Sequence, residues 1–80
     1  MKLLNLTISR VDMALFEGEV ISVTLPGVDG EMTLLAEHAP IISPLKKGVI
    51  TVKKENSEEE TFPISSGTLE MSGNRAIVLV

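Results

Sequence analysis

The sequence predicts an all-β fold, a flattened β-sandwich or barrel of about ten short, mostly antiparallel strands in two sheets. Apolar and polar residues alternate with a period of two along most of the chain, which is typical of strands with one solvent-exposed face. Turn residues, chiefly Gly, Pro, Asn and Asp, interrupt these runs at short intervals. An apolar period of 3.6 does not persist long enough for a helix. The 80 residues suit one domain, spanning residues 1–80.

The N-terminal third contains the first predicted strands. Residues 4–9 alternate strictly, which predicts a strand with one buried face. The next apolar segment is expected to turn at Glu17-Gly18, because glycine tolerates turn conformations. Residues 20–25 alternate again and predict a strand with one apolar face, made of Ile21, Val23 and Leu25.

The middle third, from Gly30 to Gly48, is the most informative stretch. It begins at Gly30, the last residue of a loop predicted at residues 26–30. It continues as a short apolar strand and is interrupted at residues 37–40. An apolar run containing Pro44 follows, and a Lys-Lys-Gly turn ends it. This order predicts two short strands, each bounded by turns.

The C-terminal third predicts a hairpin and two further strands. Residues 55–58 are expected to form the hairpin tip, beside an acidic cluster at residues 58–60 that opposes edge-to-edge pairing. Pro63 cannot donate a ladder hydrogen bond, so its strand is expected at an edge of the sheet or at a bulge. Residues 75–80 are almost entirely apolar and predict a strand buried on both faces.

Composition excludes several classes of partner. The net charge is −4, with eleven acidic and seven basic side chains, and Phe16 and Phe62 are the only aromatic residues. Because a basic stripe and aromatic stacking platforms are missing, nucleic acid is not an expected partner. The same charge disfavours an anionic membrane surface. Apolar runs are far shorter than the ~20 residues that span a bilayer, so we expect no direct membrane insertion.

The sequence contains no recognisable catalytic group. His38 is the only imidazole and cysteine is absent, so neither a nucleophile–base pair nor a zinc site is indicated. Phosphate-binding and calcium-binding loop motifs are also missing. We therefore expect no catalytic, metal-binding or cofactor-binding residue, no cofactor, and no small-molecule substrate of the chain's own. One alternative is a small all-β carrier module of lipoyl or biotinyl type, with Lys53-Lys54 near a hairpin tip, although the flanking residues do not match.

Short motifs in a fixed order connect the chain to a known family. Across nearly all 80 residues the chain resembles the N-terminal β-sandwich domain of the epsilon subunit of F-type ATP synthase. The matching motifs are Phe16-x-Gly18, Pro26-Gly27, Gly30-Glu31, His38-Ala39-Pro40, Leu45-x-x-Gly48 and Gly67-x-x-Glu70. The family commonly has Gly where this chain has Thr33, and Pro-Gly where it has Ala36-Glu37. The turn before His38 is therefore expected to be built differently.

The resemblance implies a non-catalytic central-stalk subunit that links the gamma subunit to the c-ring and couples ion translocation to ATP synthesis. It implies a peripheral location on the cytoplasmic face of a bacterial plasma membrane. Family members commonly continue into a C-terminal helical hairpin, whose functions are not expected of a chain that stops at Val80. The implied c-ring contacts are Val28, Asp29, Gly30, Glu31 and His38. The implied gamma contacts are Ser9, His38, Ile41, Ile42 and Ser43.

Each implied contact has a purely structural alternative. Glu31 could be a solvated carboxylate, and the loop at residues 26–30 an ordinary loop. His38 could be a turn histidine whose ring nitrogen bonds a backbone carbonyl. Ile41 and Ile42 are neighbours on a predicted strand and so point to opposite faces, which predicts that one lies in the core and the other at an interface.

Overall fold

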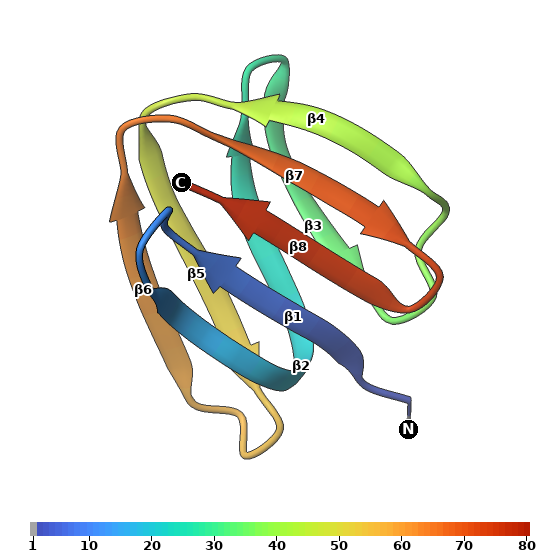
Figure 1. Cartoon of the computed structure of the whole chain (residues 1–80). Coiled ribbons are helices and arrows are strands. Elements are labelled where there is room, and N and C mark those ends of the chain that lie inside the picture. Colours follow the sequence, from blue (N-terminus) through green and yellow to red (C-terminus); the bar gives the residue numbers. More distant parts are fainter. Residues whose placement is uncertain (1) are drawn as a thin grey trace.

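A computed structural model describes residues 2–80 of the chain. Within them the chain forms eight strands and no helix (Figure 1). The strands are β1 (Leu4–Ser9), β2 (Ala14–Gly27), β3 (Gly30–Leu35), β4 (Ile41–Leu45), β5 (Gly48–Lys54), β6 (Glu59–Ile64), β7 (Gly67–Ser72) and β8 (Arg75–Leu79). The all-β prediction is confirmed, with eight strands in place of the expected number of about ten.

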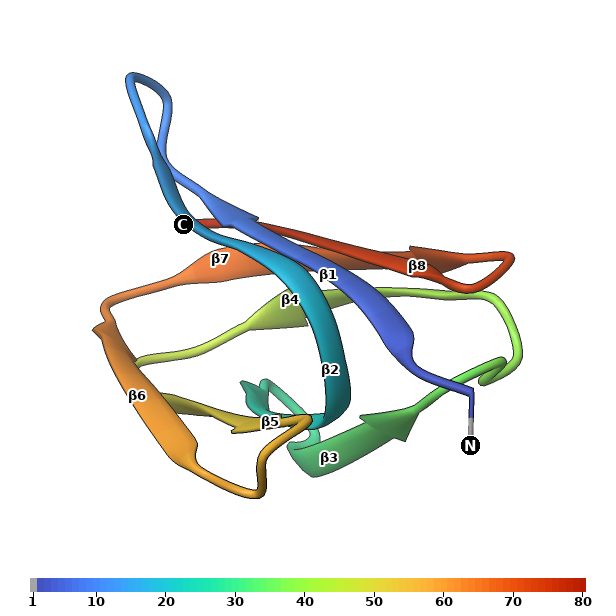
Figure 2. The ribbon, with the colours of Figure 1, turned by 90° about the horizontal axis from the view of Figure 1, so that it is seen from below.

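The strands form one hydrogen-bonded sheet that folds into two layers. Its order is β1-β8-β7-β4-β2-β5-β6, with β3 paired to β2 and a further pairing of β1 with β2. One layer contains β1, β8, β7 and β4, and the other contains β3, the second half of β2, β5 and β6 (Figure 2). Among the described strands only β1 and β8 run parallel; all other pairs are antiparallel.

Strand β2 belongs to both layers. Its first half pairs with β1, and its second half pairs with β3 and β5. Fourteen residues at about 3.3 Å each would extend for roughly 43 Å, whereas the longest dimension of the molecule is 32 Å. The strand must therefore curve, as Figure 2 shows.

The predicted turn at Glu17-Gly18 is wrong for this reason. Gly18 lies inside β2, opposite Leu6 of β1. The chain turns earlier, where the Arg10 N–H donates to the Met13 carbonyl over 2.8 Å. A glycine inside a strand often marks a bend, and Gly18 lies in the strand that curves between the layers.

The predicted apolar face of residues 20–25 is also partly wrong. The pairing of β2 with β5 shifts register between Val20 and Ser22. A bulge of this kind adds one residue and changes which side chains point inward. Val20, Val23 and Leu25 are buried as a result, whereas Ile21 is only half-buried.

Strand β8 is central in its layer but buried on one face only. It pairs with both β1 and β7, and Ala76 and Val78 are fully buried. Leu79 points the other way and is 55% exposed, so the prediction of burial on both faces is wrong. The edge prediction for Pro63 is confirmed, because β6 pairs only with β5.

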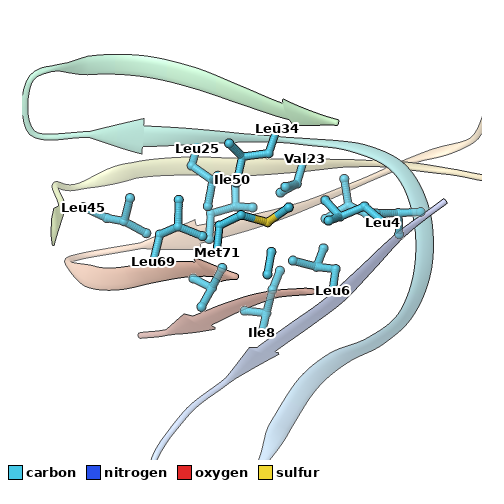
Figure 3. Packing of buried hydrophobic residues seen from close by; sticks show 14 of the residues in the cluster. Leu4, Leu6, Ile8, Val23, Leu25, Leu34, Leu45, Ile50, Leu69 and Met71 are labelled. Carbon is cyan, nitrogen blue, oxygen red and sulfur yellow. The ribbon is translucent and has the colours of Figure 1, made fainter. Parts of the chain in front are cut away.

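The core lies between the two layers and is entirely apolar in the described part of the chain. Strands β1, β2, β5, β7 and β8 each contribute two or three buried hydrophobic residues, and β3, β4 and β6 contribute one each, Leu34, Leu45 and Ile64 (Figure 3). At one seam, the Phe16 ring of β2 packs edge-to-face on the Phe62 ring of β6, with centroids 6.1 Å apart. Such a close-packed interior deforms little under load.

Candidate functional site

The loop between β2 and β3, together with the first two residues of β3, contains four of the five expected c-ring residues. Gly27 pairs with Gly30 across a two-residue turn formed by Val28 and Asp29. Gly30 has a φ of 133°, which side chains rarely adopt. A Cβ added at Gly27 would lie 2.7 Å from the Gly30 carbonyl oxygen, so the turn needs glycine at both ends. The residues from Val28 to Glu31 are all exposed.

Backbone hydrogen bonds hold this loop against β4 and the segment after it. The Val28 N–H donates to the Pro44 carbonyl over 3.2 Å, and the Lys46 N–H donates to the Pro26 carbonyl over 2.8 Å. These bonds connect the end of β2 and the first loop residue to the end of β4 and to Lys46. The loop therefore presents the carboxylates of Asp29 and Glu31 to solvent on a fixed support.

His38 lies away from this loop. It follows the far end of β3, and the six residues of that strand span about 17 Å at 3.3 Å per residue. The ring is exposed, and its Nδ1 atom lies 2.7 Å from the carbonyl oxygen of Ala39. The structure thus separates the expected c-ring residues into two groups. It also places the ring against a backbone carbonyl, as the purely structural alternative described.

The turn before His38 has the backbone conformation of glycine without a glycine. Glu37 has a φ of 61°, in the left-handed region. Its N–H donates to Asn74 Oδ1 over 2.8 Å, and its carboxylate pairs with the exposed Lys2 at 3.2 Å. Glu37 stands where the family commonly has Gly, and it still adopts the φ that glycine favours. The residue change therefore does not require a different backbone at this position.

Asn74, which the sequence indicated only as a turn residue, holds this region together. Its Nδ2 donates to the Leu3 carbonyl over 2.6 Å, while its Oδ1 accepts from Glu37. Its own carbonyl accepts from the Asn5 N–H at 3.1 Å. One side chain thus connects the start of β1, the β7–β8 turn and the turn that carries His38.

The expected gamma-contact residues divide between two faces of β4 and a distant strand. Ile41 is half-buried and packs on the core, and Ser43 shares its side of the strand. Ile42 points outward and is 73% exposed. The predicted opposite orientation of the two isoleucines is therefore confirmed, and an interface at Ile42 stays a prediction.

Sheet register shows what lies beside Ile42. One row across the layer contains Ile42, Glu70, Ile77 and Thr7. The next row contains Pro44, Thr68, Leu79 and Ser9. We call the apolar members, Ile42, Pro44, Ile77 and Leu79, the outer apolar face. Ser9 lies at its far border, three strand spacings or about 14 Å from Pro44.

Sequence reasoning did not identify Ile77 and Leu79 as surface residues. Along the strand, Ile77 and Leu79 alternate with the buried Ala76 and Val78. Because all of these residues are apolar, the sequence did not mark which face is exposed. Ile77 is half-buried and lies in the same row as Ile42, and Leu79 is 55% exposed and lies in the next row.

A sequence model of the ATP synthase delta/epsilon chain β-sandwich domain matches residues 3–80. The chain belongs to this family. Its membership replaces the alternative of a lipoyl or biotinyl carrier module.

Curated relatives of this family member are bacterial ATP synthase epsilon chains. The chain is 41% identical over 80 residues to the one from Sulfurimonas denitrificans, of which it covers 62%. It is 38% identical over 78 residues to the one from Chlorobium limicola, of which it covers 89%. The chain spans less than two thirds of the Sulfurimonas relative and most of the Chlorobium relative.

Two solved structures share the fold of the epsilon-family domain. A chain in the Euglena gracilis mitochondrial ATP synthase, solved as OSCP, F1 and c-ring, superposes with a TM-score of 0.94 at 23% identity. The match covers all of this chain and 51% of that chain. A chain in the central stalk and c-ring of the Tetrahymena thermophila enzyme gives 0.81 at 12% identity, covering 96% and 62% respectively.

Within residues 2–80 the family domain has no group of three His, Asp or Glu side chains placed to hold a metal ion. The described part of the chain also has no helix that could cross a membrane.

Proposed function

We propose that the chain is a non-catalytic rotor subunit of F-type ATP synthase that links gamma to the c-ring. In this role it couples ion translocation to ATP synthesis. The observation that supports the proposal is that one close-packed domain exposes two separate surfaces suited to contacts. One is the supported loop at Val28–Glu31, and the other is the outer apolar face.

The loop suits contact with polar loops of the ring. Its residues are exposed, and its charge comes from Asp29 and Glu31. Exposed ion pairs contribute only about 0–1 kcal/mol, so this contact would set orientation more than affinity. Because His38 lies at the opposite end of β3, we propose it for the gamma side and not for the ring.

The outer apolar face suits a stable contact with gamma. Ile42 and Pro44 on β4 and Ile77 and Leu79 on β8 lie on one face of the sheet, on either side of Glu70 and Thr68 of β7. Exposed apolar residues grouped with polar ones on one face suit a protein interface. Ser9 and His38 would lie at its border, while Ile41 and Ser43 would act from below by supporting Ile42.

The work of such a subunit requires stiffness. Torque is transmitted only if the loop cannot move relative to the apolar face. The continuous hydrogen-bonded sheet and the apolar core meet this requirement. We further propose that the complex lies on the cytoplasmic face of a bacterial plasma membrane, where the chain is peripheral.

Binding to gamma tests the proposed function. The chain should co-purify with gamma, and Ile42→Asp should weaken the complex at least about tenfold, since a buried unpaired carboxylate is unfavourable. Val49→Asp is the matched control, because Val49 is 50% exposed on the outer face of the opposite layer. Equal effects of the two variants, or a chain that ignores gamma, would contradict the proposal.

The ring contact is tested separately. Glu31→Lys should leave the fold unchanged, because the side chain is exposed, and should impair ion pumping in membranes that contain the assembled enzyme. Lys47→Glu reverses a charge at another exposed position and serves as the control. Normal pumping with Glu31→Lys would remove this residue from the contact.

A further inference from the structure

Strand β3 leaves one edge of the sheet unpaired. It pairs with β2 along one side, and no described strand pairs with its other side. In Figure 2, β3 lies at the boundary of the molecule. β6 also has a free edge, because it pairs only with β5. β4 pairs with β2 only through Leu45 and Gly27, so the rest of its second edge is unpaired as well.

The register identifies which backbone groups of β3 are free. Pro26, opposite Glu31, has no N–H, and its carbonyl accepts from Lys46 on the other side. Pro26 and Glu31 therefore form a non-hydrogen-bonded pair. Because such pairs alternate with hydrogen-bonded ones in an antiparallel ladder, Glu31, Thr33 and Leu35 direct their N–H and C=O groups away from β2. Of these, the Leu35 carbonyl receives one bond, from the His38 N–H at 3.3 Å.

The β3 and β6 edges are protected to different degrees. The β6 edge contains Pro63, and its first two residues, Glu59 and Glu60, belong to the acidic cluster; both features discourage pairing with another strand. The β3 edge contains neither proline nor lysine, and its register with β2 is regular throughout. It also exposes Leu35, which is 57% accessible.

We propose that the β3 edge is a self-association site, at which a second copy of this chain adds its own β3 in antiparallel orientation. Centred on Thr33, the register places Thr33 opposite its own copy and Glu31 opposite Leu35. Thr33 would form a hydrogen-bonded pair with its copy, because its backbone groups are free. Glu31 would form one with Leu35, whose carbonyl, already bonded by the His38 N–H, would accept with its second lone pair. Like charges would not face each other, and Met32 would lie opposite Leu34 on the core side.

The outer face of the layer supports a second copy as the occupant. Threonines already align across its four strands, in the order Thr61, Thr51, Thr24 and Thr33. The hydroxyls of Thr24 and Thr33 lie 3.0 Å apart. Pairing at Thr33 would continue this row into the second molecule, so that hydroxyl–hydroxyl contacts of the same kind could form across the new edge.

The interface would be weak. Three outward-directed residues per chain make it much smaller than the interfaces of stable dimers. Each chain also has a net charge of −4, which opposes association. Screening by salt should therefore strengthen the dimer. Because Glu31 is covered in the pair, self-association and the ring contact would exclude each other, a consequence that rests on the proposed function.

Sedimentation velocity tests the pairing. The chain is measured from about 10 µM to about 1 mM, the range in which weak interfaces associate, at low and high salt. A reversible monomer–dimer equilibrium is expected, and it should shift toward dimer as salt rises. Amide exchange on the unmodified chain should show protection of Glu31, Thr33 and Leu35 that increases with concentration.

Two proline variants locate the edge. Thr33→Pro removes an N–H that β2 does not use, so the fold should persist while the dimer dissociation constant rises about tenfold or more. Thr61→Pro is the control, because Thr61 occupies the same row and, two residues from Pro63, also directs its N–H away from its neighbour. The proposal is overturned if the chain stays monomeric at the highest concentration. It is also overturned if Thr61→Pro, and not Thr33→Pro, abolishes the dimer, or if the β3 amides show no concentration-dependent protection.

Discussion

Replacement of Asn74 by alanine should destabilise the domain more than its position in a surface turn suggests. The change removes two side-chain hydrogen bonds, from Nδ2 to the Leu3 carbonyl at 2.6 Å and from the Glu37 N–H to Oδ1 at 2.8 Å. At roughly 1 kcal/mol net for each bond, the free energy of unfolding should fall by about 2 kcal/mol. For a domain of this size that corresponds to a melting temperature lower by about 10 °C.

Asn56→Ala is the matched control. Asn56 also makes two side-chain hydrogen bonds, both to Glu58 within the β5–β6 hairpin tip. These bonds are local and exposed, so their loss should lower the free energy of unfolding by less than about 1 kcal/mol. Urea unfolding followed by circular dichroism measures both variants under two-state conditions.

Asn74→Asp separates the two bonds. It keeps the acceptor for the Glu37 N–H but removes the donor to the Leu3 carbonyl, which would then face a carboxylate. The decrease in the free energy of unfolding should therefore be at least half of the decrease expected for Asn74→Ala. If Asn74→Ala were no more harmful than Asn56→Ala, the assignment of Asn74 as the connection among three segments would be refuted.

Two further predictions concern the β2–β3 loop and the β5–β6 hairpin. Gly27→Ala should lower the free energy of unfolding by about 1–3 kcal/mol, because its Cβ would lie 2.6 Å from Met32 Cε and 2.7 Å from the Gly30 oxygen; a melting temperature equal to that of the unmodified chain would contradict this. The hydrogen bond with Glu60, followed by its charge, raises the pKa of Lys54 above its usual 10.5. A Lys54 pKa that is higher in the folded state stabilises the fold below pH 10.5, and this stabilisation is lost as pH rises through the folded-state pKa. Above about pH 10 the free energy of unfolding should therefore fall less steeply with pH in Glu60→Gln than in the unmodified chain.

The sequence predicted the fold class and the inward face of most strands, because a buried face imposes a period of two. The prediction was wrong where a strand curves or contains a bulge, as β2 does. Gly18 indicated a turn, yet it lies in a strand that is too long for the molecule and must curve. The bulge after Val20 also changed which side chains of β2 point into the core. Local sequence does not specify the position of such a bulge.

The candidate site shows a similar division. The loop was predicted over residues 26–30, and the structure confirms its exposed centre at Val28 and Asp29, since that turn depends on glycines next to it in sequence. Pro26 and Gly27 belong to β2 instead, and Gly30 begins β3. The neighbours of Ile42 were not predictable in this way. Pro44, Thr68, Leu79 and Ser9 share one row across the sheet only because of register between strands that are far apart in the chain. Asn74 was missed because its partners lie 71 and 37 residues away.

The curvature of β2 explains how one small domain can present two separate contact regions without a hinge between them. The strand starts at Ala14, opposite Ser9 at the border of the outer apolar face, and ends at Gly27, where the acidic loop begins. A single covalent strand therefore runs from one proposed contact to the other, and ladder bonds to β1, β3 and β5 support it along its length. Any rotation of the loop relative to the apolar face would break some of these bonds. Stiffness between the two surfaces is thus a property of this one element.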